Sequence, residues 1–185
     1  MTRPLRALVP SLSLLALLVA ACSGTPEAEM KTVEKVDLPR FMGAWYVIAN
    51  IPTFIEKGAH NAVESYRLAA DGSIETTFTF RAGAFDGKLK TYNPRGFVVD
   101  RETNALWGMR FIWPIKADYR IVYLDDDYSR TIIGRQKRDY VWIMARTPQI
   151  PDADYQRLLQ FAVDLGYDAS KVQKVPQRWP AGSAP

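Results

Sequence analysis

The chain has 185 residues, 48% of them hydrophobic, with 24 basic and 20 acidic side chains and a formal net charge of +4. Without Arg3 and Arg6, which lie in the amino-terminal segment, 22 basic residues stand against 20 acidic ones, too mild an excess for a nucleic-acid-binding protein. Cys22 is the only cysteine, so the sequence beyond it offers no disulfide framework, thiolate metal site or thiol nucleophile. The length suits one domain.

Residues 1–21 have the features of an export signal. Arg3 and Arg6 precede an apolar run from Ala7 to Leu18, and the small residues Ala20 and Ala21 follow. Because a membrane-spanning helix needs about 20 consecutive apolar residues, this run is too short to serve as one. We therefore expect the segment to be removed.

The residues around Cys22 resemble the lipobox of bacterial lipoproteins, here Val19-Ala20-Ala21-Cys22. That resemblance implies acylation of Cys22, cleavage before it and stable membrane anchoring through several acyl chains. An incidental cysteine in a cleaved signal is the alternative. Ser23 stands where an aspartate would resemble an inner-membrane retention signal, which favours the outer membrane, facing the periplasm.

Residues 22–36 contain no large apolar cluster, and we predict that they form a flexible, lipidated tether. Residues 37–178 form the predicted domain, and residues 179–185 form a tail. Within the domain, short runs rich in β-branched and aromatic residues alternate with turn residues, which is typical of a sandwich or an up-and-down barrel. Eight strands are predicted at about 44–51, 62–69, 73–81, 95–100, 105–112, 118–124, 130–135 and 140–146.

Alternation is clearest in the third run, where Ile74, Phe78 and Phe80 share one face and Thr77 lies on the other. Asp71-Gly72 is a hairpin signal that makes the second and third runs antiparallel neighbours. The pattern predicts an all-β fold, an eight-stranded antiparallel up-and-down barrel.

Residues 152–165 predict one helix, with acidic residues in the first turn and Gly166 as its stop. Because the eighth run is apolar on both faces, this helix is expected to pack outside the barrel, over Val122, Leu124, Val141 and Ile143. The sequence from Lys171 onward predicts a short edge strand and then a frayed end.

Three ordered motifs resemble those of the lipocalin family. Gly43-Ala44-Trp45 resembles the G-x-W motif, Ala117-Asp118-Tyr119 resembles the T-D-Y motif with alanine in its first position, and Arg146 stands where the third motif places its arginine. Residues 138–148, with Gly166-Tyr167-Asp168 after the helix, are similar to bacterial outer-membrane lipocalins and their apolipoprotein D-like relatives. The resemblance covers about residues 38–175, and it gives Gly43, Trp45, Asp118 and Arg146 structural roles.

Barrel closure brings the beginning of the first strand beside the end of the last, so Trp45 and Arg146 are predicted to meet. A guanidinium over an indole contributes about 0.5 to 2 kcal/mol, and its planar fork can cap nearby carbonyl groups. A core tryptophan and an unrelated solvated arginine are the alternative.

Extending the alternation predicts the interior. The residues expected to bind a ligand there are Tyr66, Phe78, Phe80, Met109, Phe111, Tyr119, Ile121, Tyr123 and Trp142, and the other inward residues are Leu68, Ile74, Val98, Trp107, Tyr140 and Met144. Glu64, if it points inward, and the tyrosine hydroxyls would orient a ligand in this apolar lining. A fatty acid, lysophospholipid or similar apolar molecule, held for envelope lipid storage or transport, fits best. A porphyrin or small aromatic compound, and a barrel filled by its own side chains, remain open.

The residues that enzymes and metal sites need are missing from the sequence. His60 is the only histidine and lies in the predicted loop 52–61, which carries Phe54 and Ile55 and is expected to cover the open end. Asp125, Asp126 and Asp127 are most simply a solvated turn. We therefore expect no catalytic residues, metal or cofactor, although a lipocalin-fold enzyme and a purely structural lipoprotein remain alternatives. A homodimer also stays open.

Overall fold

The computed structural model describes residues 28–112 and 115–180. The predicted export signal, Cys22 and residues 181–185 of the predicted tail lie outside the described residues. Within the described part, no helix combines the length and the apolar character needed to cross a membrane.

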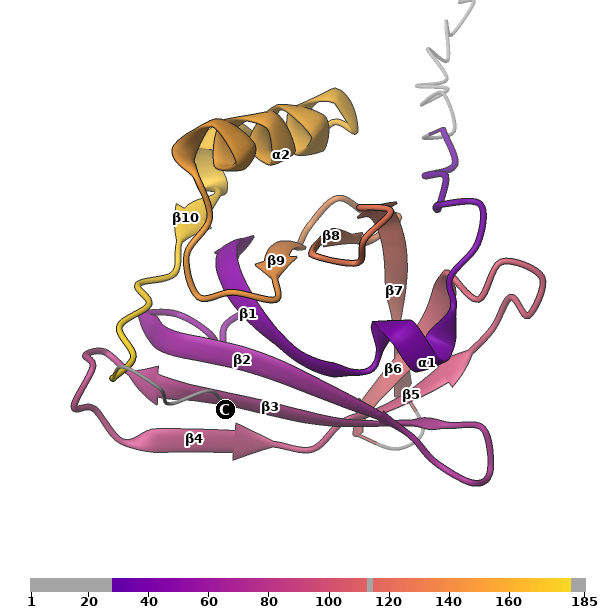
Figure 1. The fold of residues 1–185 in the computed structure, drawn as a ribbon, viewed down its shortest axis with the longest axis horizontal. Coiled ribbons are helices and arrows are strands. Elements are labelled where there is room, and N and C mark those ends of the chain that lie inside the picture. Colours follow the sequence, from indigo (N-terminus) through magenta and orange to yellow (C-terminus); the bar gives the residue numbers. More distant parts are fainter. Residues whose placement is uncertain (1–27, 113–114, 181–185) are drawn as a thin grey trace, which may run out of the picture.

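Antiparallel strands close into a barrel (Figure 1). The elements are α1 (Leu38–Phe41), β1 (Gly43–Ile51), β2 (Ala59–Leu68), β3 (Ile74–Ala82), β4 (Leu89–Tyr92), β5 (Arg95–Val98), β6 (Leu106–Ile112), β7 (Ile115–Leu124), β8 (Arg130–Gly134), β9 (Val141–Ala145), α2 (Asp152–Asp164), a 3-10 turn (Ala169–Lys171) and β10 (Gln173–Lys174). Neighbours in the sheet follow the order β10-β1-β2-β3-β5-β6-β7-β8-β9, and β1 also pairs with β9. The predicted eight-stranded barrel is confirmed, with β4 and β10 as additions.

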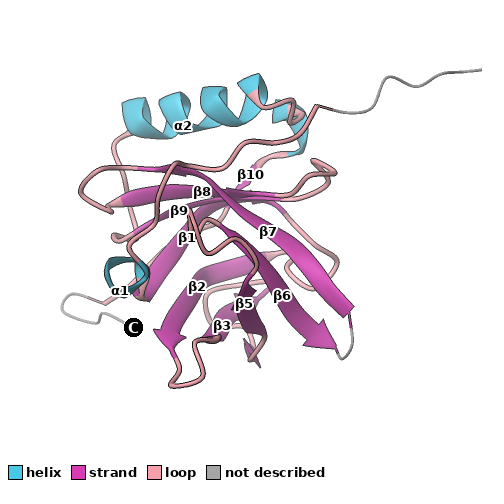
Figure 2. Ribbon diagram, turned by 90° about the vertical axis from the view of Figure 1, so that its right-hand side faces the viewer, coloured by secondary structure: helices cyan, strands magenta, loops and turns pink. Residues whose placement is uncertain are grey.

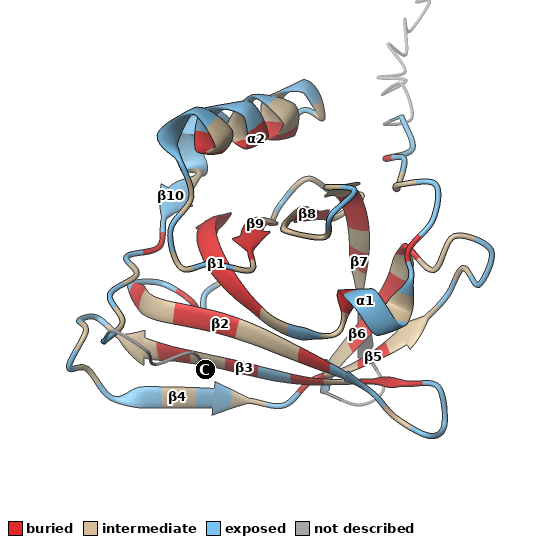
Figure 3. Cartoon of the chain, viewed as in Figure 1, coloured by how far each residue is buried: buried red, intermediate tan, exposed pale blue. Residues whose placement is uncertain are grey.

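The sequence alternation that predicted β3 corresponds to its burial. Ile74, Phe78 and Phe80 are buried and Thr77 is exposed, and buried and less buried segments alternate along this strand in Figure 3. The predicted hairpin before it is present, because Leu68 pairs with Ile74 across a turn in which Gly72 adopts a φ of 77°. Glycine adopts such a left-handed conformation without the steric cost that a side chain brings.

The sequence did not indicate β4. Its four residues are polar or exposed, and its leucine, Leu89, is 52% exposed, so it lacks the one-sided apolar pattern that marks a buried strand. It pairs with the end of β3, placing Tyr92 opposite Phe78, and β5 pairs with the beginning of β3. The two short strands therefore share one edge of β3.

Helix α2 packs outside the barrel, along the side formed by β7, β8 and β9 (Figure 2). Leu158 and Ala162 are fully buried in an apolar cluster that includes Val122, Val141 and Ile143, as predicted. Leu124 differs from the prediction, because it packs into the barrel interior. The pairing register of β7 with β8 shifts between Ile121 and Tyr123, and this bulge reverses the alternation for the residues beyond it.

The described part of the predicted tether, from residue 28 on, is not free. Met30 and Val36 are 2% and 0% exposed, and the backbone N–H of Val33 donates to Ile121 O at 2.9 Å. Met30 fills a gap beside Tyr167, whereas Val33 and Val36 contact the barrel core. Composition alone missed this because each isolated apolar residue enters a gap formed by distant parts of the chain.

The carboxyl-terminal segment is also more ordered than a frayed end. After β10, which confirms the expected edge strand, Gln177 Nε2 donates to Val47 O at 2.8 Å and to Ala62 O at 3.0 Å. Trp179 packs edge-on against Tyr46, with ring centroids 5.5 Å apart.

Candidate functional site

The closed end of the barrel is capped by Arg146. Its guanidinium carbon lies 3.8 Å from the ring centroid of Trp45, which confirms the predicted pairing. Nη1 donates to Ala44 O at 2.9 Å, and Nη2 donates to Arg40 O at 2.9 Å and to Phe41 O at 3.0 Å. Gly43 has a φ of 92°, and a Cβ there would lie 3.4 Å from Arg146 Nη1, so glycine suits both the backbone and this close approach.

Above this cap, aromatic rings fill the lower part of the barrel. Trp107 stacks on Tyr119 with a centroid distance of 5.1 Å and an interplanar angle of 8°, and Phe41 meets Trp107 edge-on at 5.5 Å. The hydroxyls of Tyr66 and Tyr119 lie 2.7 Å apart and form a hydrogen bond. This packed layer is the floor beneath any interior space.

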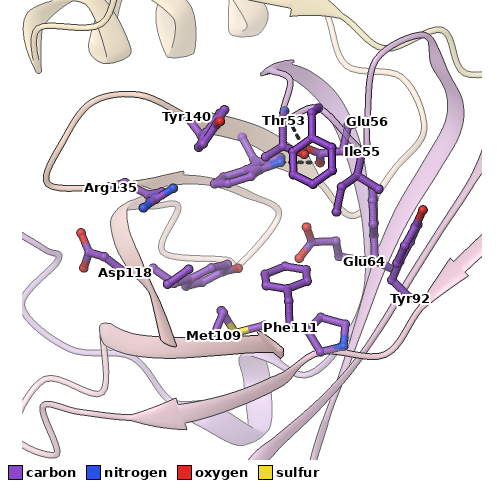
Figure 4. Close-up of a pocket in the computed structure, with 16 residues that line it drawn as sticks. Thr53, Ile55, Glu56, Glu64, Tyr92, Met109, Phe111, Asp118, Arg135 and Tyr140 are labelled. Carbon is purple, nitrogen blue, oxygen red and sulfur yellow. Dashed lines mark hydrogen bonds between the residues drawn. The ribbon is translucent and has the colours of Figure 1, made fainter. Parts of the chain in front are cut away.

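A cavity of about 280 Å³ lies between this floor and the open end. Its volume is near the lower limit of about 300 Å³ typical of small-molecule sites. Most of the side chains that line the cavity are apolar or aromatic, and a few are polar or charged. The lining consists of Thr53, Phe54, Ile55, Glu56, Glu64, Phe78, Tyr92, Pro94, Met109, Phe111, Ala117, Asp118, Tyr119, Arg135, Tyr140 and Trp142. Figure 4 shows Glu56 and Glu64 on one side of it and Asp118 and Arg135 on the other. We call this space the barrel cavity.

Five of the nine residues predicted to bind a ligand line the barrel cavity: Phe78, Met109, Phe111, Tyr119 and Trp142. Phe111 is 54% exposed, so it contributes from an accessible position. Tyr66, Phe80 and Ile121 are buried in the barrel core without lining the cavity. They support the lining residues rather than contribute cavity surface.

The placement of Tyr123 in the interior was wrong. Its ring packs against Phe161 of α2 with centroids 5.1 Å apart, and its hydroxyl bonds to Asp125 and Arg157. The β7 bulge is again the reason, because it turns this side chain outward. Leu68, also expected inside, is 38% exposed at the end of β2.

Several lining residues were missed. Tyr92 lies on β4, which the sequence did not indicate, and Arg135 follows the end of β8. Glu56 lies in the loop expected to cover the open end, and its neighbours Phe54 and Ile55 were the available signal. Asp118, assigned a structural role, accepts hydrogen bonds from Arg120 Nε at 3.2 Å and from the backbone N–H of Gln136 at 2.6 Å, and also lines the cavity.

Two of the carboxyl groups in the cavity lining belong to Glu56 and Glu64. Glu56 is 5% exposed and accepts hydrogen bonds from Trp142 Nε1 at 2.8 Å and from the backbone N–H of Thr53 at 2.9 Å. The half-buried Glu64 accepts a hydrogen bond from the Tyr66 hydroxyl. Burial raises the pKa of Glu64 to about 7; the Tyr66 hydrogen bond opposes this rise, and the charge of Glu56 adds to it.

The remaining candidate residues lie outside this arrangement. His60 is part of β2 rather than of the preceding loop, and its ring packs edge-on against Phe85 at 4.8 Å, away from the cavity lining. Asp125 is ion-paired with Arg130 at 2.5 Å and is therefore not simply solvated. Across residues 28–112 and 115–180, no group of three or more histidine, cysteine and acidic side chains is placed to hold a metal ion.

The closed barrel, its apolar cavity and its arginine-capped tryptophan define the class of small up-and-down β-barrels with an internal calyx. The sequence profile described as "Lipocalin-like domain" matches residues 36–177. The chain therefore belongs to the lipocalin family.

Comparisons with individual proteins agree with this assignment. Temperature-induced lipocalin-1 of Arabidopsis thaliana is 33% identical over 165 residues, covering 83% of this chain and 86% of the relative. Outer membrane lipoprotein Blc of Escherichia coli K12 is 31% identical over 173 residues, covering 88% and 92%. The structure of insecticyanin from the tobacco hornworm Manduca sexta has the same fold, with a TM-score of 0.64 at 16% identity, covering 83% of this chain and 86% of that one.

Proposed function

We propose that this lipocalin is a lipid-anchored, non-catalytic binding protein that holds a fatty acid, a lysophospholipid or a similar apolar ligand for envelope lipid storage or transport. The observation that carries this proposal is the barrel cavity itself, an interior space of about 280 Å³ with a mainly apolar lining. Burying apolar ligand surface there contributes roughly 25 cal/mol per Å², and the few polar groups can fix the ligand's orientation.

The proposed location is the bacterial outer membrane, with the barrel facing the periplasm. Two observations support it: the lipobox-like Val19-Ala20-Ala21-Cys22, and the similarity to the outer membrane lipoproteins Blc of Escherichia coli and Citrobacter freundii, at 31% and 32% identity. In this proposal the acylated Cys22 holds the barrel at the membrane, where lipids can reach its open end.

A titration with the uncharged fluorescent probe N-phenyl-1-naphthylamine, followed by displacement with a lysophospholipid or a fatty acid, tests the binding. We expect saturable binding of one probe per chain. Met109→Glu and Phe78→Glu place an unpaired charge in the cavity and should abolish it, because an apolar ligand cannot compensate a buried carboxylate. Thr77→Glu, on the exposed face of β3, is the matched control.

Circular dichroism confirms that each variant is folded before its affinity is compared. Equal affinities in cavity and outer-face variants would place the probe elsewhere on the protein. A folded parent without saturable binding would replace the proposal with a structural envelope lipoprotein.

A further inference from the structure

One side of the barrel cavity carries two carboxyl groups without a cationic partner. Glu56 accepts hydrogen bonds only from N–H groups, and Glu64 accepts one from the Tyr66 hydroxyl. Within residues 28–112 and 115–180, neither carboxyl group forms a salt bridge. Buried carboxylates are usually paired, because leaving water costs them solvation energy that hydrogen bonds only partly replace.

The opposite side of the cavity is different, because each of its charged groups has an ionic partner, although the buried Nε of Arg135 has no hydrogen-bond partner among the described residues. Arg135 forms a salt bridge with Asp139 at 3.3 Å, and Asp118 forms one with Arg120 at 3.2 Å. Figure 4 shows Asp118 and Arg135 across the cavity from Glu64. The uncompensated charge that a ligand meets is therefore negative and lies on the side of Glu56 and Glu64.

The position of Glu64 also constrains how an amphiphile enters. Glu64 pairs with Phe78 across β2 and β3 in the barrel wall, and its Tyr66 partner is bonded to Tyr119, which belongs to the floor. An acyl chain inserted with its methyl end first would bring hydrocarbon against this carboxyl group and would satisfy none of its hydrogen bonds. A fatty-acid carboxylate inserted first would meet like charge, so it would bind less tightly than an amphiphile whose polar group donates hydrogen bonds. Such a donor satisfies the acceptor oxygens of Glu64 and brings no negative charge to it.

We propose that the barrel cavity selects amphiphiles whose polar group is a protonated amine, and that this amine enters first and pairs with Glu64 beside Glu56. The inference rests on the proposed ligand-binding function and names the head-group chemistry that the site prefers. The amine supplies the cation that both carboxyl groups lack, while its apolar body contacts Phe78, Met109 and Trp142.

This pairing predicts a pH dependence. The titratable groups that face Glu64 are Tyr66 on its own strand, Tyr119 on β7 and Glu56 in the loop between β1 and β2. The two hydroxyls have pKa values raised well above 10 by burial, so they stay neutral. Because burial holds the pKa of Glu64 at about 7, its carboxylate form is present above that pH and is lost below it. Amine affinity should therefore rise with pH.

The test uses dodecylamine, dodecanol and dodecanoate, which share one tail length, as competitors for N-phenyl-1-naphthylamine. The protein is the full-length chain, and measurements are made at pH 8 and pH 5.5. At pH 8 we expect dodecylamine to compete more strongly than dodecanoate by about tenfold to a hundredfold, the range of one charge-assisted hydrogen bond. Lowering the pH to 5.5 should remove most of this preference.

Glu64→Gln keeps the side-chain shape and one acceptor oxygen but cannot ionise. It should abolish both the amine preference and its pH dependence, and competition is compared with the probe affinity measured for the same variant. Glu75→Gln is the matched control, because Glu75 lies on the outer face of β3 in exposed ion pairs with Arg67 and Arg95. This control should behave as the parent does.

The outcomes separate this inference from the proposed function. Absence of probe binding to the folded parent would overturn both. Probe binding with equal competition by amine and acid, or with unchanged selectivity in Glu64→Gln, would overturn the inference alone. If Glu64→Gln fails to fold, carbon-13 NMR of the Glu64 carboxyl in the parent decides: dodecylamine should lower its pKa, and an unchanged or raised pKa would contradict the pairing.

Discussion

Removing Arg146 tests the cap at the closed end of the barrel. In Arg146→Ala, the carbonyl groups of Arg40, Phe41 and Ala44 lose their charged donor, and Trp45 loses the guanidinium 3.8 Å above its ring. Hydrogen bonds to charged groups contribute about 1.5 to 3 kcal/mol each when buried. Because the closed end of the barrel is only partly buried, water replaces some of the lost hydrogen bonds. We therefore expect a total loss of about 3 kcal/mol in the free energy of unfolding.

The contact with the indole can be isolated by a double-mutant cycle. Trp45 is completely buried, so Trp45→Ala leaves a void and should cost about 3 to 5 kcal/mol. If the two side chains stabilise each other, Trp45→Ala and Arg146→Ala should be coupled by about 0.5 to 2 kcal/mol in urea unfolding followed by circular dichroism. Burial lowers the pKa of Arg146, but the guanidinium stays protonated at neutral pH, so the coupling should persist there. Strictly additive effects would refute the stacking argument.

Three further changes test other parts of the structure. Glu64→Gln should raise the free energy of unfolding at pH 8 by up to about 3 kcal/mol, because the pKa of Glu64 is about 7 in the fold and 4.5 outside it. The folded state holds this proton more tightly, so the parent loses stability as pH rises from 4.5 to 7; a gain equal at pH 4 and pH 8 in urea unfolding would contradict this account. Leu158→Ala, in the fully buried stripe of α2, should cost about 2 to 5 kcal/mol in the same assay, whereas Gln156→Ala on the exposed face should have little effect; similar costs for both would argue against packing of this helix on the barrel. Cys22→Ser in the full-length chain should abolish labelling by a radioactive fatty acid and recovery with the membrane while the barrel stays folded, and a variant that remained labelled would disprove the lipobox assignment.

The barrel could be predicted from the sequence because its strands repeat a simple physical pattern. Ile74, Phe78 and Phe80 alternate with polar neighbours, and this period of two places them on one face of any strand. Once the chain is taken as a closed barrel, its geometry brings Trp45 to Arg146. These features need no knowledge of side-chain packing.

Features that depend on local irregularity were not predictable in the same way. The bulge in β7 inserts one residue, and it moves Tyr123 outward and Leu124 inward although the sequence alternation continues. The burial of Met30 depends on a gap beside Tyr167, which exists only after the distant α2 region has packed. Neither effect leaves a periodic signal in the sequence.

The cavity lining falls between these two cases. Met109 and Trp142 follow from strand alternation, whereas Glu56 and Arg135 come from segments next to strands, where no period applies. The sequence allowed an inward Glu64 without fixing its neighbours. Its contact with Tyr66, the nearby charge of Glu56 and the lack of a cationic partner could be recognised only in three dimensions.

Methyl NMR of selectively labelled methionines tests the internal binding site most directly. Met109 lines the barrel cavity, whereas Met30, equally well buried, lies in the apolar cluster beneath α2 and outside the barrel. Titration of the full-length chain with dodecylamine should shift the Met109 methyl resonance until one equivalent is bound and should leave that of Met30 unchanged. Saturable binding that shifts Met30, or that leaves Met109 unchanged, would contradict a ligand site inside the barrel.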